Sequence, residues 1–176
     1  MVATPQGSAM DVTTFYALFS ATCFTLLGLW WSVVQRHEAW LRDPEQRAVV
    51  GGVYLSFLLP ALMGLFAQVG GTETPAIWRG SFVVIAIIGG VSTLRLLRRS
   101  RTRPGIHGPL VRHRWVAVVV YALVAVIGAV PEVATPLQVK PIQAEAVLLI
   151  LLILIAHGLV WEFMVSTAEE DEPARA

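Results

Sequence analysis

Five long apolar runs, separated by short polar segments, dominate the chain. They cover about residues 12–34, 49–69, 77–97, 115–133 and 142–165. A helix needs roughly 20 predominantly apolar residues to cross a bilayer. The runs lack the apolar/polar alternation of membrane barrel strands, and lipid cannot satisfy the exposed backbone groups of other structures. The pattern therefore predicts an all-α fold, a polytopic integral membrane bundle of five transmembrane helices.

The fourth run is the shortest of the five. Its apolar core at Trp115–Val130 is followed by Pro131, and proline in a helix interior removes a backbone hydrogen bond. If this run does not cross the membrane, four spans remain and the C-terminal tail moves to the opposite side.

The connections between the runs are short. We expect a surface turn at Trp40–Glu45, with a short interfacial helix before it as an alternative. Around Pro131, Pro136 and Pro141 we expect an extended loop, because closely spaced prolines leave little room for a helix.

Basic residues are distributed unevenly between these connections. Eleven of the thirteen fall on one side of the predicted membrane, and the other side has only Arg79 and Lys140. Since basic residues concentrate on the cytoplasmic side, we predict an outside N-terminus and a cytoplasmic C-terminus. The chain then divides into an extracytoplasmic segment at 1–11, a transmembrane domain at 12–165 and an acidic cytoplasmic tail at 166–176, which we expect to be disordered.

The composition supports a membrane location. Hydrophobic residues make up 56% of the chain and charged residues 14%, against about 45–50% and about 25% in soluble domains. One lysine stands against twelve arginines, and asparagine is absent. This bias is typical of a GC-rich genome, so we expect the plasma (cytoplasmic) membrane of a high-GC bacterium.

Small and polar residues recur every four positions along the second run. Gly52, Ser56, Pro60, Gly64 and Gln68 form one stripe on a helix. Small residues allow membrane helices to approach closely, so the stripe is either a packing seam or the lining of a pathway. Other residues that we expect in helix packing are Ala17, Ala21, Thr25 and Gly90.

Ionisable residues inside a membrane are candidates for function. His157 lies within the fifth run, and Glu162, five residues on, is about 140° around the helix from it. His157 is interpreted as a proton-sensitive gate, as a haem or metal ligand, or as a structural histidine bonded to a neighbouring helix. Glu132, Lys140 and Glu145 lie near the outer surface, where each can be solvated, and we assign them structural roles.

Seven arginines cluster around the third loop. We expect them to contact anionic lipid, because the cytoplasmic leaflet carries negative charge. The loop has no folded reader or aromatic platform for nucleic acid. The seven residues are Arg95, Arg98, Arg99, Arg101, Arg103, Arg112 and Arg114.

No catalytic signature occurs in the chain, so we predict no enzymatic activity, no cofactor and no metal. The favoured hypothesis is an oligomeric channel or transporter for an ion or small solute. The expected partners are the lipid bilayer and either further copies of the chain or another membrane protein. The alternatives are a non-catalytic subunit or scaffold of a larger complex, and a haem- or metal-binding membrane protein that uses His157. The residues expected to line or gate a pathway are Ser56, Pro60, Gln68, His157 and Glu162.

Overall fold

The computed structural model describes residues 12–70, 74–100 and 109–171. Every regular element among these residues is helical, which confirms the all-α prediction. The elements are α1 (Val12–Arg36), α2 (Ala39–Arg42), α3 (Pro44–Gly70), α4 (Pro75–Ser100), α5 (Pro109–Ala129), the 3₁₀ helix η1 (Pro131–Leu137) and α6 (Pro141–Asp171).

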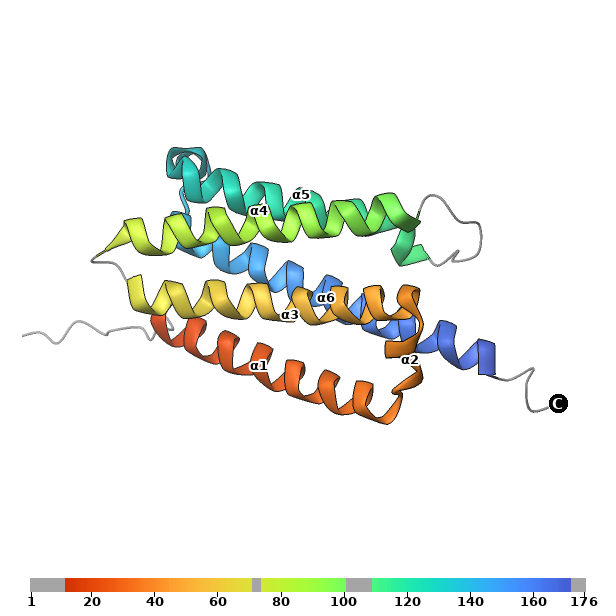
Figure 1. Cartoon of the computed structure of the whole chain (residues 1–176). Helices are drawn as coiled ribbons and strands as arrows, with labels where there is room; N and C mark the ends of the chain where they lie inside the picture. The colour runs from red at the N-terminus through yellow and green to blue at the C-terminus, as the bar shows by residue number, and fades with distance from the viewer. Residues whose placement is uncertain (1–11, 71–73, 101–108, 172–176) are drawn as a thin grey trace, which may run out of the picture.

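Four of the long helices form a closed ring. In it α3 packs against α4, α4 against α5, α5 against α6, and α6 against α3. The fifth long helix, α1, lies outside this ring, where it packs along α3 and touches α6 (Figure 1). The bundle has two ends, which we name after the short helices that lie there: the α2 end and the η1 end.

Four helices are long and apolar enough to cross a membrane. They lie at Val12–Arg36, Pro44–Gly70, Pro75–Arg98 and Pro141–Val165. The apolar part of α5 is shorter, at Trp115–Ala129. These lengths support a membrane-embedded helical bundle, and the crossing of α5 stays a prediction.

Proline marks the start of each long helix after α1. Pro44, Pro75, Pro109 and Pro141 are the first residues of α3, α4, α5 and α6. Proline suits this position because its fixed φ is helical and the first backbone N–H groups of a helix have no partner within it. At α3 the carboxylate of Asp43 also accepts hydrogen bonds from the backbone N–H groups of residues 45 and 46, at 3.3 and 3.2 Å.

The prediction of a surface turn at Trp40–Glu45 is wrong in one respect. The short helix α2 includes Trp40, and this side chain is only 8% exposed. Its ring stacks on His37 at a centroid distance of 4.3 Å and meets Phe163 of α6 edge-on at 4.9 Å. Because the indole buries a large apolar surface, it attaches the connection to the bundle.

The expected extended loop around Pro131 and Pro136 is instead the 3₁₀ helix η1. Pro131 occupies its first position, where a proline has no backbone hydrogen bond to lose. The backbone N–H of Val133 donates to the carbonyl of Val130 at 3.1 Å. A 3₁₀ turn therefore fits between prolines that leave too little room for an α-helix.

The first part of the predicted disordered tail is helical. α6 continues to Asp171, and residues 172–176 lie outside the described part of the chain. The Thr167 hydroxyl donates to the carbonyls of Phe163 and Met164, each at 3.1 Å. Extending an existing helix is far easier than starting one. The long apolar helix α6 therefore continues through the first acidic residues of the tail.

Candidate functional site

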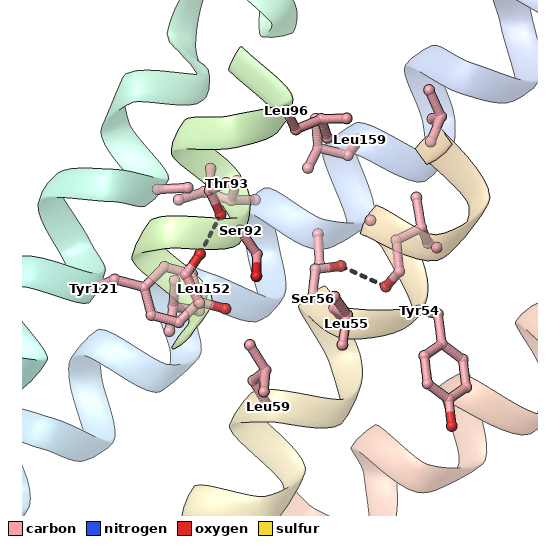
Figure 2. A pocket seen from close by; sticks show the side chains of 18 of the residues that line it. Tyr54, Leu55, Ser56, Leu59, Ser92, Thr93, Leu96, Tyr121, Leu152 and Leu159 are labelled. Atoms are coloured by element: carbon pink, nitrogen blue, oxygen red, sulfur yellow. Dashed lines mark hydrogen bonds between the residues drawn. The ribbon is translucent and has the colours of Figure 1, made fainter. Parts of the chain in front are cut away.

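A cavity of about 550 Å³ lies inside the four-helix ring, in the half of the bundle toward the α2 end. All four ring helices contribute side chains to it (Figure 2). Its walls are mostly apolar and include Leu55, Leu59, Leu96, Leu152 and Leu159. Pockets for small molecules have this character: an apolar lining, a few polar groups, and a volume of roughly 300–1,000 Å³.

Five of the lining residues carry hydroxyl groups. Tyr54 points away from the other lining side chains (Figure 2), and the remaining four are Ser56, Ser92, Thr93 and Tyr121. Two of these four are engaged within their own helices, since Ser56 donates to the carbonyl of Val53 at 2.7 Å and Thr93 to that of Gly89 at 2.8 Å. Neither Ser92 nor Tyr121 has a hydrogen bond to its side chain within the described residues. These two hydroxyls are therefore available to a bound solute.

The Tyr121 ring rests on the backbone of α4. A Cβ atom added to Gly89 would lie 2.5 Å from both Cε1 and Cζ of this ring. Glycine is thus the residue that lets the aromatic ring of α5 lie flat against α4. This close approach fixes the direction in which the Tyr121 hydroxyl points.

Toward the η1 end, large side chains fill the ring. Met63, Phe82, Val124 and Leu149, one from each ring helix, are fully buried in a single apolar cluster. This packing separates the cavity from the η1 end of the bundle.

One arginine lines the cavity. Arg95 of α4 is exposed and contributes to the lining. It is one of the residues predicted to contact anionic lipid. Arg98 is also exposed, whereas the side chains of the other five arginines lie outside the described part of the molecule. The lipid contact stays a prediction.

The residues predicted to line a pathway do not gather at one place. Ser56 lines the cavity, and Pro60 is fully buried one turn further along α3. Gln68 lies near the η1 end, where its amide nitrogen is 3.4 Å from the carbonyl oxygen of Tyr16 and 3.3 Å from that of Gly64. It therefore connects α3 to α1 instead of facing the cavity.

His157 also lies away from the cavity. It is exposed, and its ring meets Phe57 of α3 edge-on at 5.5 Å. Its Nδ1 is 2.8 Å from the carbonyl oxygen of Ile153, one turn earlier in its own helix. Glu162 is half-buried. No group of three or more metal-binding side chains occurs in the described ranges, and a role for His157 as a ligand stays a prediction.

The small residues differ in what they contact. A Cβ on Gly64 would collide with the Ser20 side chain of α1, and one on Gly52 would lie 3.1 Å from Cδ2 of Leu96 of α4. Both glycines therefore sit at close helix contacts. Gly90 is less tightly packed, since its Cβ would be 3.7 Å from that of Tyr121.

The predicted stripe on α1 does not pack inside the chain. Ala21 and Thr25 are exposed, and Ala17 is half-buried. The face of α1 toward α3 carries Tyr16, Ser20 and Cys23 instead. Within the chain, these larger side chains form the interface and Gly64 of α3 supplies the space for them. Packing of Ala21 and Thr25 against another membrane helix stays a prediction.

The expectation that Glu145 is solvated is wrong as well. The side chain is fully buried, and neither carboxyl oxygen has a hydrogen-bond partner among the described residues. Glu145 shares a face of α6 with Leu149, Leu152 and Ala156, all of which are buried. Because every residue from 146 to 156 is apolar, the sequence has no periodic signal that could have assigned Glu145 to the buried face.

A second cavity, of about 660 Å³, lies where α1, α2 and α3 meet. Its lining is rich in aromatic side chains, and it includes Phe24, Trp30, Trp31, Tyr54 and Arg47. Of these two cavities in the described part of the chain, the first lies within the ring of helices and the second lies outside it.

No family model, no curated protein and no solved structure matches this chain.

Proposed function

We propose that this chain is a small transport protein of the plasma membrane and that the ring cavity binds its solute. The observation that carries the proposal is a cavity of about 550 Å³ between four apolar helices, with two uncommitted hydroxyls, those of Ser92 and Tyr121, on its wall. Close packing holds membrane helices together. A cavity loses such packing contacts, so its presence is better explained by the binding of a solute.

The packed core favours a carrier over a permanently open channel. Met63, Phe82, Val124 and Leu149 separate the cavity from the η1 end. A solute in the cavity would reach that end only after these helices rearrange, as in carriers that alternate access around a fixed site.

The lining indicates the class of solute. The leucines of the lining would contact an apolar part of the solute. The hydroxyls of Ser92 and Tyr121 would orient one or two polar groups of the solute. Arg95 adds a positive charge on the lining. We infer a small organic solute with an apolar part and a hydrogen-bonding or anionic group, which extends the earlier hypothesis of an ion or small solute.

The proposed topology has five spans, with the N-terminus outside and the C-terminus in the cytoplasm. The apolar part of α5, Trp115–Ala129, corresponds to about 22 Å at 1.5 Å per residue. This is shorter than the roughly 30 Å of a hydrocarbon core, a mismatch that local thinning of the bilayer and extension of the flanking arginine side chains accommodate. α5 also packs against α4 and α6. On this topology the α2 end faces the cytoplasm, and the ring cavity lies in the cytoplasmic half of the membrane.

Cysteine labelling tests this topology. In a Cys23→Ala background, an impermeant thiol reagent added to intact cells is expected to label Val139→Cys and not Ala39→Cys, because the two exposed positions lie at opposite ends of the bundle. Opening the cells should make Ala39→Cys reactive. Labelling of Ala39→Cys from outside would show that the orientation is the reverse of the proposed one. Protection of both positions in intact cells would remove α5 as a span, since Val139 would then be cytoplasmic.

Solute uptake into liposomes tests the function. Ser92→Cys in the Cys23→Ala background is expected to react with a hydrophilic maleimide, and the reaction should stop uptake of the solute that a broad screen identifies. Val91→Cys is the matched control, because this neighbouring side chain is exposed on the outer surface of the bundle, where lipid keeps the reagent away. Uptake equal to that of protein-free liposomes across the screen would refute the transport function.

A second candidate function is a non-catalytic subunit or scaffold. It is favoured by the exposed small residues of α1, since Ala21, Thr25 and Gly28 present a surface on which another membrane helix can pack closely. Substitution of Ala21 by leucine would then release a partner that co-purifies with the wild type in mild detergent, and leave any solute uptake unchanged.

A further inference from the structure

Glu145 is the buried ionisable side chain that the cavity does not explain. It lies in the first turns of α6, at the η1 end, and is fully buried. Both carboxyl oxygens lack a hydrogen-bond partner among the described residues. Placing a charged group in such a position without a partner is strongly unfavourable, so this carboxyl group has a chemical reason to hold a proton.

Tyr16 of α1 is the polar residue that approaches it. The Tyr16 hydroxyl donates its proton to the carbonyl of Ile142, three residues before Glu145 in α6, at 2.7 Å. The Tyr16 ring also packs edge-on against Phe82 at 6.3 Å. The hydroxyl is therefore held in place beside the carboxyl group without bonding to it.

Cations at this end of the bundle are engaged elsewhere or face outward. Arg79 donates from Nε to the carbonyl of Gly128 at 2.9 Å and from Nη2 to that of Ala129 at 3.0 Å, which caps the end of α5. Lys140 is exposed. Neither forms an ion pair with Glu145 in the described structure.

The other elements packed against α6 bring little charge to this half of the bundle. α1 contributes Tyr16 and the buried thiol of Cys23, and η1 contributes the exposed Glu132. Tyr121 of α5 lies toward the α2 end, where it lines the cavity. α3 has only the neutral amide of Gln68 there. Among these groups none is a cation that would stabilise an ionised Glu145.

We propose that Glu145 is a proton-binding site that couples solute transport to proton movement. This inference rests on the proposed transport function. Along the same buried face of α6, Leu149 leads from Glu145 to Leu152, which lines the cavity. Seven residues of helix correspond to about 10 Å. While Glu145 is open to the η1 end, its carboxylate takes up one proton and is then buried as the neutral acid. When α6 moves so that Glu145 opens toward the ring cavity, the carboxyl group releases that proton to water on the α2 side of the membrane.

The link to transport is mechanical. Loss of the proton makes the buried position of Glu145 unfavourable, so ionisation favours a displacement of α6 that brings the carboxylate to water. The same helix forms one wall of the cavity through Leu152, Ile155, Ala156 and Leu159. Movement of α6 therefore changes the shape of the cavity and the protonation state of Glu145 together. Binding of the proton shifts the affinity for the solute, and binding of the solute shifts the affinity for the proton.

Infrared spectroscopy of the purified protein in lipid tests the proton site without any transport. The wild type is expected to show the C=O band of a protonated carboxyl group at neutral pH. Glu145→Gln should lose this band and Glu132→Gln, an exposed glutamate at the same end, should keep it. If Glu145→Gln does not fold, Glu145→Asp should move the band. A wild-type spectrum with only ionised carboxylates at neutral pH would overturn the proposal.

A pH gradient across liposomes tests the coupling. With the η1 side acidic, uptake by the wild type and by Glu132→Gln should exceed uptake without a gradient, whereas Glu145→Gln should lose this stimulation and retain solute exchange at equal pH. Wild-type uptake that ignores the gradient would overturn the coupling. Absence of uptake for every solute would instead refute the transport function, and the infrared result would still decide whether Glu145 binds a proton.

Discussion

Replacing Gly89 with alanine is expected to lower the free energy of unfolding by about 1–3 kcal/mol, the usual cost of overpacking a core. The added methyl group would lie 2.5 Å from two atoms of the Tyr121 ring and 2.9 Å from a third. Tyr121 is itself only 4% exposed, so the ring can move only by displacing its neighbours or by entering the cavity. The free energy of unfolding should fall even though alanine favours a helix over glycine by about 1 kcal/mol.

Gly90→Ala is the matched control for this prediction. The same methyl group at Gly90 would lie 3.7 Å from Cβ of Tyr121, an ordinary van der Waals contact. Unfolding of both variants by a denaturing detergent should therefore show a destabilised Gly89→Ala and an unchanged or stabilised Gly90→Ala. Solute uptake should fall in Gly89→Ala as well, because the displaced ring occupies the cavity. Equal stability of the two variants would contradict the close packing of α4 and α5.

Trp40→Ala is expected to be the most destabilising of the substitutions, at about 3–5 kcal/mol, the range for removing a buried tryptophan. The Trp40 indole contacts aromatic rings of three segments: Trp30 of α1 at 6.4 Å, His37 at 4.3 Å and Phe163 of α6 at 4.9 Å. Its loss would leave a void at the α2 end and release the connection between α1 and α3. The C-terminal part of α6 would lose its anchor.

Trp31→Ala provides the comparison, since Trp31 is the same residue type but 49% exposed. Detergent unfolding of the two variants should differ by at least about 2 kcal/mol. Hydrogen exchange should rise near Phe163 in Trp40→Ala and stay unchanged in Trp31→Ala. A Trp40→Ala protein as stable as the wild type would mean that this aromatic cluster does not hold the α2 end together.

The helices themselves could be predicted from the sequence. Each of the five apolar runs lies largely within a long helix, although the last residues of the run at 115–133 belong to η1. The prolines that precede the runs are the first residues of α3, α4, α5 and α6. This follows because a run of about 20 apolar residues and a starting proline are local signals that need no tertiary contact. The short helix η1 was not predicted. Pro131 and Pro136 leave too little room for an α-helix, but they still permit a 3₁₀ turn.

The site was predicted only in part. Ser56 lines the ring cavity, whereas His157 and Gln68 lie elsewhere. The amide nitrogen of Gln68 and Nδ1 of His157 lie within hydrogen-bond distance of carbonyl oxygens of a neighbouring helix and of the same helix, respectively. Their roles in a pathway stay predictions. Ser92 and Tyr121 lack such local partners, and this difference is visible only once the helices are assembled.

The sequence by itself determined that the chain forms long apolar helices suited to a membrane, because hydrophobic length and composition are properties of single segments. Which faces meet was decided by the tertiary structure alone. In lipid the outward and inward faces of a helix are both apolar, so hydrophobic periodicity gives little contrast between them. Glu145 illustrates the difference: its place at the start of α6 suggests contact with water, and only the packing of the neighbouring helices buries it.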